Sequence, residues 1–123
     1  MPDAGDALAR FTALLGPPGQ QILAELRDQD VTPATALGLG SRLRAHYPAE
    51  LVATALAQQE LRQRARAKFS RAMDMYFTRA GLEQASAELV ARHRAARFAA
   101  AGAGPGQVAD LCCGIGGDLV ALA

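Results

Sequence analysis

The stretch VADLCCGIGGD, residues 108–118, decides how the second half of the chain is interpreted. The apolar segment Gln107–Cys112 is typical of a buried strand, and the glycines that follow are typical of a tight turn. A helix is expected to begin at Asp118. This order places free backbone N–H groups and a helix N-terminus beside the carboxyl end of a strand, where α/β sheets bind ligands.

Two familiar nucleotide-binding motifs do not fit this loop. The dinucleotide fingerprint GxGxxG needs a glycine three positions after Gly116, where Leu119 stands. A P-loop needs a Gly-Lys-Ser/Thr sequence, which is absent. What remains is Asp110 followed by Gly114 and Gly116. Glycines at these positions allow positive φ and let a ligand approach the backbone closely.

The pattern of an apolar strand, an acid, small or apolar residues and Gly-x-Gly resembles motif I of class I S-adenosylmethionine-dependent methyltransferases. The segments FTRAGLEQAS (77–86) and VARHRAARF (90–98) precede the loop in the order found in bacterial THUMP-like-domain methyltransferases. The segment LRQRARAKF (61–69) is similar to the helical extension of that group. The resemblance covers roughly residues 50–123 and implies that the loop lies under the methionine part and ribose of S-adenosylmethionine.

The chain is also distantly similar to trimethylguanosine synthases, in which a Thr-Pro-Glu segment and a helix precede a Cys-Gly-x-Gly-Gly loop. Those proteins carry Asn where this chain has Asp118, and Thr-Pro-Glu where it has residues 78–80 (TRA). These departures argue against cap-type substrate recognition.

Eight residues are predicted to border the cofactor: Thr78, Gln84, Arg94, Asp110, Cys112, Gly114, Gly116 and Asp118. Arg94 is included because its charge lies on an otherwise apolar helix face and needs a carboxylate or a ligand as its partner. Asp110 would contact the methionine amine, directly or through water. Each polar residue also has a purely structural interpretation, as a turn, a helix cap or, for Arg94, a side chain that extends to solvent or pairs with a carboxylate. Catalytic residues stay unassigned.

Cys112 and its neighbour Cys113 are the only cysteines. Two adjacent cysteines are a poor disulfide pair and supply only half of a zinc site. They are therefore interpreted as small residues beside the glycine loop, and no metal site is predicted.

The rest of the chain is predicted to be helical, because it holds 28 alanines and 12 arginines among its 123 residues and few β-branched residues. Thr32 is a good N-cap, with Pro33 at the first helical position. Residues 75–78 could be extended, and residues 102–106 should form a turn. Helices are expected over about 3–15, 18–27, 33–47, 48–69 and from 82 or 86 to 100.

The predicted fold class is mainly α, with a helical domain over 1–70. A connector and helix over 71–103 would lead into the start of a Rossmann-like domain over 104–123. A complete doubly wound domain needs several βαβ units of about 30 residues. The chain is therefore expected to be the N-terminal part of a methyltransferase and to be inactive alone. Its unpaired strand is expected either to pair with another copy or to be displaced and disordered.

Charge separates the two halves of the chain. Residues 1–60 carry 4 basic and 7 acidic side chains, whereas residues 61–123 carry 9 and 5. The basic half and the resemblance favour RNA as the methyl acceptor, although for the basic residues from Arg62 to Arg71 a solvated helix face is the favoured interpretation. No apolar run reaches membrane length and no signal peptide is apparent, so a cytoplasmic location is expected. The alternative function is a helical protein–protein interaction module without enzymatic activity.

Overall fold

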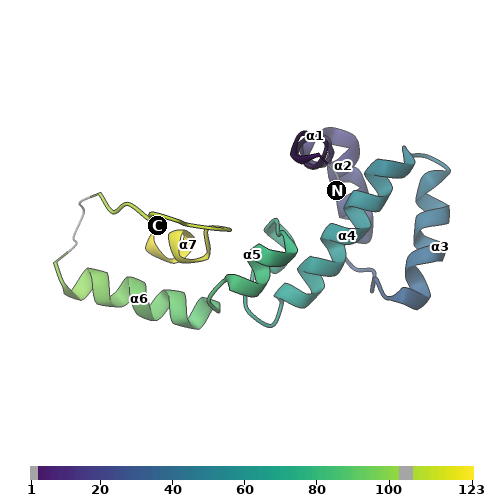
Figure 1. Ribbon diagram of the computed structural model, residues 1–123. Helices are drawn as coiled ribbons and strands as arrows, with labels where there is room; N and C mark the ends of the chain where they lie inside the picture. Colours follow the sequence, from purple (N-terminus) through teal and green to yellow (C-terminus); the bar gives the residue numbers. More distant parts are fainter. Residues whose placement is uncertain (1–2, 103–106) are drawn as a thin grey trace. The chain divides into compact units, whose positions relative to one another are not determined.

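The computed structural model describes residues 3–102 and 107–123, and these residues are mainly helical (Figure 1). The expected turn at Gly104, Pro105 and Gly106 lies outside the described residues. The elements in chain order are α1 (Ala4–Leu15), α2 (Pro17–Leu26), α3 (Pro33–Arg44), α4 (Ala49–Ala65), a 3₁₀ turn η1 (Ala72–Asp74), α5 (Arg79–Gln84), α6 (Glu88–Ala100) and α7 (Gly117–Leu122).

The chain divides into two compact units, Met1–Gln63 and Arg64–Ala123. The first unit contains α1 to α3 and most of α4, and α1 packs against α2. Its core is aliphatic. The side chains that are at least nine-tenths buried there include Leu14, Ile22, Leu23, Leu26, Val31, Leu39, Leu43, Val52 and Ala55.

Two glutamines of α4 fix the connection between α2 and α3. Gln59 Nε2 donates to the carbonyl of Arg27 at 3.3 Å. Gln63 accepts from the backbone N–H of Val31 at 2.7 Å and donates to the Val31 carbonyl at 3.1 Å. One carboxamide thus satisfies both backbone groups of Val31, whose side chain enters the core.

The second unit has a smaller core. Phe69 and Phe77 pack with their ring centroids 5.9 Å apart, and Leu82 and Ala91 are buried with them. Helix α6 packs along α7, as Figure 1 shows for the green and yellow helices. These contacts bring the connector after α5 and the loop before α7 to the same region.

Several predicted helix boundaries are confirmed. Thr32 is the N-cap of α3: its hydroxyl accepts from Thr35 N–H at 3.2 Å, and the Thr35 hydroxyl accepts from Thr32 N–H at 2.9 Å. For the helix predicted from 82 or 86 to 100, the later start agrees with α6 to within two residues, whereas the start at 82 was wrong. Residues 79–100 instead form α5 and α6, separated at the extended residue Ala85. Helix α4 ends at Ala65 rather than at Phe69, which belongs to the second core.

The strand predicted over Gln107–Cys112 is not formed. Residues 107–110 have no regular secondary structure, and residues 111–112 form a turn. A strand needs a neighbouring strand to receive its backbone hydrogen bonds, and no other strand occurs in residues 3–102 and 107–123. Val108 and Leu111 are consequently exposed rather than buried.

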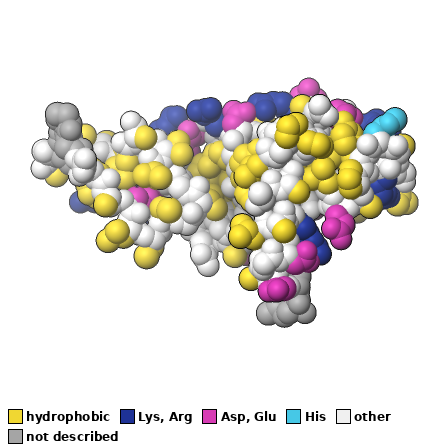
Figure 2. Space-filling view, turned by 90° about the horizontal axis from the view of Figure 1, so that it is seen from above, with side chains coloured by type: hydrophobic (Ala, Val, Ile, Leu, Met, Phe, Trp, Pro, Cys, Tyr) yellow, Lys and Arg dark blue, Asp and Glu magenta, His cyan; other side chains and the backbone are white. Residues whose placement is uncertain are grey.

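Hydrophobic side chains reach the surface in both units, and yellow atoms are visible on the face drawn in Figure 2. Within the described ranges, no helix has both the length and the apolar character that crossing a membrane requires.

Candidate functional site

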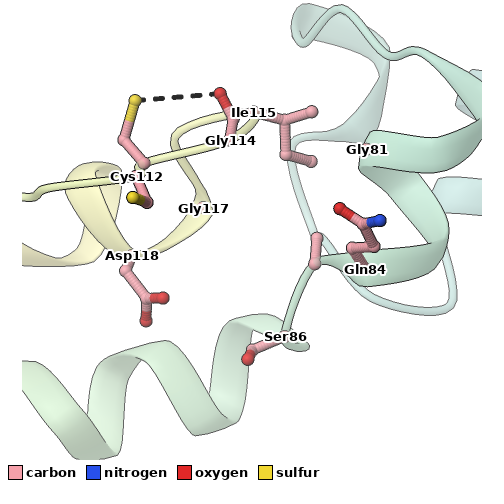
Figure 3. Close-up of a pocket in the computed structure, with 10 residues that line it drawn as sticks. Gly81, Gln84, Ser86, Cys112, Gly114, Ile115, Gly117 and Asp118 are labelled. Atoms are coloured by element: carbon pink, nitrogen blue, oxygen red, sulfur yellow. Dashed lines mark hydrogen bonds between the residues drawn. The ribbon is translucent and has the colours of Figure 1, made fainter.

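A pocket of about 230 Å³ lies in the second unit, between the glycine loop and the α5–α6 connector (Figure 3). Its lining comes from two stretches of sequence that lie about 30 residues apart, and both are described by the structure. The lining residues are Gly81, Gln84, Ala85, Ser86, Cys112, Cys113, Gly114, Ile115, Gly117 and Asp118.

The loop from Cys112 to Gly116 has an unusual backbone. Cys112, Gly114 and Gly116 all have positive φ, at 61°, 57° and 80°. Glycine adopts such angles without a steric penalty, whereas a cysteine does so rarely. Gly116 N–H donates to the Cys113 carbonyl at 2.9 Å, and Cys113 Sγ lies 3.8 Å from the Gly114 carbonyl, the dashed line in Figure 3. The loop therefore turns sharply before α7 begins.

Two glycines allow the loop to approach its neighbours. A Cβ on Gly81 would lie 2.5 Å from Ile115 Cγ2 and 2.8 Å from Thr78 Oγ1. Figure 3 shows the Ile115 side chain directed toward Gly81. A Cβ on Gly117 would lie 3.3 Å from the ring of Phe69. The absence of a side chain at Gly81 is thus required for contact between α5 and the loop.

Lys68 fixes the opposite wall of the pocket. Its ammonium donates to the carbonyls of Leu82 and Ala85 at 2.7 and 2.8 Å, and to that of Glu83 at 3.3 Å. These carbonyls lie at the end of α5, where intrahelical donors are lacking and a cation is favourable. Lys68 thereby ends α5 and orients Ala85, a lining residue.

Glu88 anchors the start of α6. Its carboxylate accepts from the backbone N–H and the hydroxyl of Ser70, both at 3.0 Å, and from Arg92 at 2.9 Å. Its own N–H donates to the Lys68 carbonyl at 2.8 Å. The pKa of Glu88 is lower than its ordinary value, and the largest cause is the hydrogen bond from the Ser70 backbone N–H. The hydrogen bond from the Ser70 hydroxyl and the charge of Arg92 lower this pKa further.

Asp118, the second residue of α7, forms an ion pair with α6. Arg94 Nη1 lies 3.0 Å from both carboxylate oxygens of Asp118 and 2.9 Å from Ser86 Oγ. Figure 3 shows the Asp118 carboxylate directed toward α6. This cluster connects the loop, the connector and α6.

The pocket brings together four of the eight residues expected to border a cofactor: Gln84, Cys112, Gly114 and Asp118. The other four do not appear among the described lining residues. Thr78 caps α5 by accepting from Gly81 N–H at 3.0 Å. Arg94 binds Asp118 from outside the lining. Gly116 is the N-cap of α7.

Asp110 has a distinctive environment. Its Oδ2 is buried and has no hydrogen-bond partner in the described part of the chain. Oε1 of Gln59, in the first unit, is a second buried oxygen of this kind.

Sequence reasoning missed Gly81, Ser86 and Lys68. The position of Gly81 three residues after Thr78 could have indicated a capped helix start, but its contact with Ile115 had no local signal. Cys112 and Cys113 are free and exposed. No group of three or more His, Cys, Asp or Glu residues that could hold a metal occurs within the residues described.

Comparison with known proteins gives one match. Residues 6–65 match the model of a family described as a domain of unknown function (DUF8688). The match covers nearly all of the first unit and does not include the pocket. No curated protein and no solved structure matches the chain.

Proposed function

We propose that the chain is part of an S-adenosylmethionine-dependent methyltransferase, and that the pocket beside residues 112–118 holds the methionine and ribose part of the cofactor. The observation that carries this proposal is the pocket itself, because the loop that resembles motif I lines it together with the α5–α6 connector. In this proposal residues 107–123 belong to the entry of a Rossmann-like domain, whose strand forms beside neighbouring strands.

The residues present fit such a ligand. The lining contains no lysine or arginine, so it suits a ligand without phosphates. A volume of about 230 Å³ lies below the range of roughly 300–1,000 Å³ for sites that enclose a whole small molecule, which agrees with a site for part of the cofactor. Asp110 is outside the lining, and in this proposal its unpaired oxygen contacts the ammonium group of the methionine part directly or through water.

The bound cofactor would supply a methyl group activated by its sulfonium. The chain's own residues would hold and orient it: the loop backbone at Gly114 would approach it closely, and Gln84 would offer a carboxamide from the other wall. No residue of the chain is assigned to proton transfer.

Amide NMR of the 123-residue chain tests the proposal directly. Titration with S-adenosylmethionine should shift the amide signals of Gly81, Gly114 and Gly117, with a Kd of about 1 mM for a partial site. ATP is the control and should leave them in place, because the lining offers no cation for its phosphates. A folded chain whose loop signals do not respond to S-adenosylmethionine would contradict the proposal.

RNA is the proposed methyl acceptor, and one surface supports it. A groove of about 260 Å³ on α6 is lined by Arg94, Arg97, Phe98 and Ala101. The Phe98 side chain is 49% exposed, and Arg97 forms no ion pair with a described residue. An exposed aromatic ring can stack on a base while a guanidinium contacts phosphate.

Fluorescence anisotropy with single-stranded RNA checks the acceptor. Phe98→Ala and Arg97→Met should weaken binding severalfold, with a steep loss at higher salt. Leu89→Ala on the same helix is the matched control, since Leu89 is exposed and lies outside the groove. Equal binding by all three variants and the unaltered chain would remove RNA from the proposal.

The second candidate is a helical interaction module, favoured by the surface of the first unit. Leu8 and Leu37 are 67% and 74% exposed, and a groove of about 300 Å³ lies between residues of α1 and the start of α4. Analytical ultracentrifugation separates this candidate from the first. If the module interpretation is correct, Leu8→Glu abolishes association with a partner or a second copy. In that case the amide signals of the pocket residues do not shift when S-adenosylmethionine is added.

A further inference from the structure

We propose that Arg94 is a positioning residue that holds the glycine loop against α6 through Asp118, and that Asp118 serves this pair rather than the ligand. The inference has a structural arm, that Arg94 holds the loop, and a ligand arm, that Asp118 does not contact the ligand. Only the ligand arm rests on the proposed function. Arg94 and Asp118 would then be excluded from the cofactor contacts that the sequence resemblance implied.

The geometry of the pair is specific. One nitrogen of Arg94, Nη1, lies 3.0 Å from each oxygen of Asp118, so this nitrogen is shared between the two carboxylate oxygens. The same nitrogen lies 2.9 Å from Ser86 Oγ. Ser86 and Asp118 both line the pocket, on opposite stretches of the lining. Arg94 is not a lining residue itself, and it therefore connects the two stretches of the lining by binding one residue of each.

The loop needs such an anchor because its local stabilisation is weak. Helix α7 has six residues, and its N-cap, Gly116, makes no side-chain capping bond. Three residues before α7 have positive φ, and among residues 3–102 and 107–123 no strand ladder supports the approach to the loop. The start of α7 is tied to the rest of the unit by the close approach of Gly117 to the ring of Phe69, by packing against α6 and by the pair with Arg94.

The two acids of the loop have different environments. Asp118 is neutralised by Arg94, with the two side chains 36% and 49% exposed. Asp110 has a buried oxygen with no partner in the described residues. A carboxylate already bound to a guanidinium attracts a second cation weakly, so a cationic ligand group should be recognised by Asp110 and not by Asp118.

Hydrogen exchange of the loop amides tests the structural arm. Arg94→Met and Asp118→Asn should each speed exchange at Gly114, Gly116 and Gly117 by about two- to fivefold, as expected for a partly exposed pair. The double variant should match either single one, because both remove the same interaction. Additive effects, or no change, would overturn the proposal.

Two further variants separate positioning from a general loss of structure. Arg97→Met, on the same helix, should leave loop exchange unchanged because Arg97 has no ion pair within the described residues. Arg94→Lys should restore slow exchange, since a single nitrogen of Arg94 makes all three bonds and an ammonium has three donors. Failure of the lysine variant to restore protection would count against the proposal.

Binding of two ligands tests the assignment of the acids. S-adenosylmethionine carries an ammonium, whereas 5′-methylthioadenosine lacks the amino-acid part. Asp118→Asn should weaken both by the same two- to fivefold factor, roughly the strength of the lost pair, whereas Asp110→Asn should weaken S-adenosylmethionine alone. Selective loss in Asp118→Asn would place Asp118 on the ligand and overturn the inference.

The two arms distinguish the two proposals. If the unaltered chain binds neither ligand, the cofactor proposal fails, and the exchange experiment still decides the role of Arg94. If ligands bind and loop exchange does not respond to Arg94→Met, the cofactor proposal stands and the positioning role is wrong.

Discussion

The first unit fully buries leucine, isoleucine and valine side chains, whereas the fully buried side chains among the described residues of the second unit are alanines. Phe69, Phe77 and Leu82 add larger groups to the second core, each at 3–5% exposure. The second unit is instead connected by individual polar groups, above all Lys68, Glu88 and Arg94. A unit held by few polar groups loses more when one of them is changed. Two of these groups bind lining residues of the candidate pocket: Lys68 binds the Ala85 carbonyl, and Arg94 binds Ser86 and Asp118.

Removing a core side chain should produce the largest effect. Leu26 is fully buried in the first unit, so Leu26→Ala should lower the free energy of unfolding of that unit by about 2–5 kcal/mol. Urea denaturation followed by circular dichroism measures this. Leu37→Ala, at a residue 74% exposed, is the control and should change stability by less than about 0.5 kcal/mol. Similar losses in both variants would mean that the first unit is not held by its aliphatic core.

A glycine replaced in each unit sharpens the comparison. Gly81→Ala should destabilise the second unit by about 1–3 kcal/mol, because the new Cβ would overlap Ile115 and Thr78. Gly38→Ala in α3 should stabilise the first unit by up to about 1 kcal/mol, since nothing lies within 4 Å of its added Cβ. Thermal unfolding of both variants measures the difference. The changes in stability of the two variants are expected to have opposite signs. Changes of the same sign would contradict the close approach at Gly81.

Loss of the Lys68 ammonium should leave three carbonyls at the end of α5 without their donor. Lys68→Met should therefore cost about 1–3 kcal/mol and should loosen the pocket wall at Ala85. Arg66→Met, at an exposed neighbour in the same turn, is the control. Amide exchange at residues 82–86 gives the readout. Unchanged exchange in Lys68→Met would show that α5 ends for another reason.

The smallest expected effect is a pH dependence from Glu88. Its pKa is lower in the folded chain than in the unfolded chain, so its contribution to stability is present above the unfolded value, about 4.3. It is lost as the pH falls through the lower, folded value. Glu88→Gln should flatten stability between about pH 5 and pH 3 relative to the unaltered chain. An unchanged acid slope in the variant would assign that slope to other carboxylates.

Helix starts were the most predictable part of the fold. Thr32 and Pro33 act within one turn, so their capping role follows from adjacent residues. The break between α5 and α6 depends on Lys68, which lies 14 to 17 residues from the carbonyls that it binds, and no local pattern predicts it. The expected strand at residues 107–112 failed for a related reason, since apolar residues alone do not make a strand without a neighbour.

The candidate site was predictable on one side only. The glycine spacing drew attention to Gly114 and Gly116, and the structure places positive φ at both. The opposite wall, formed by Gly81 and Ser86, has no motif of its own. For Arg94 the sequence required a carboxylate, a ligand or solvent, and only the three-dimensional arrangement identifies Asp118 as the partner.

Lys68 is the only lysine in the chain. Apart from the chain's terminal amine, its Nζ is thus the sole target for amine-selective acylation, and its three hydrogen bonds shield it while the second unit is folded. The rate at which an acylating reagent modifies Lys68 therefore reports how often the end of α5 opens. The natural sequence provides this chemical reporter of the pocket wall without an engineered label.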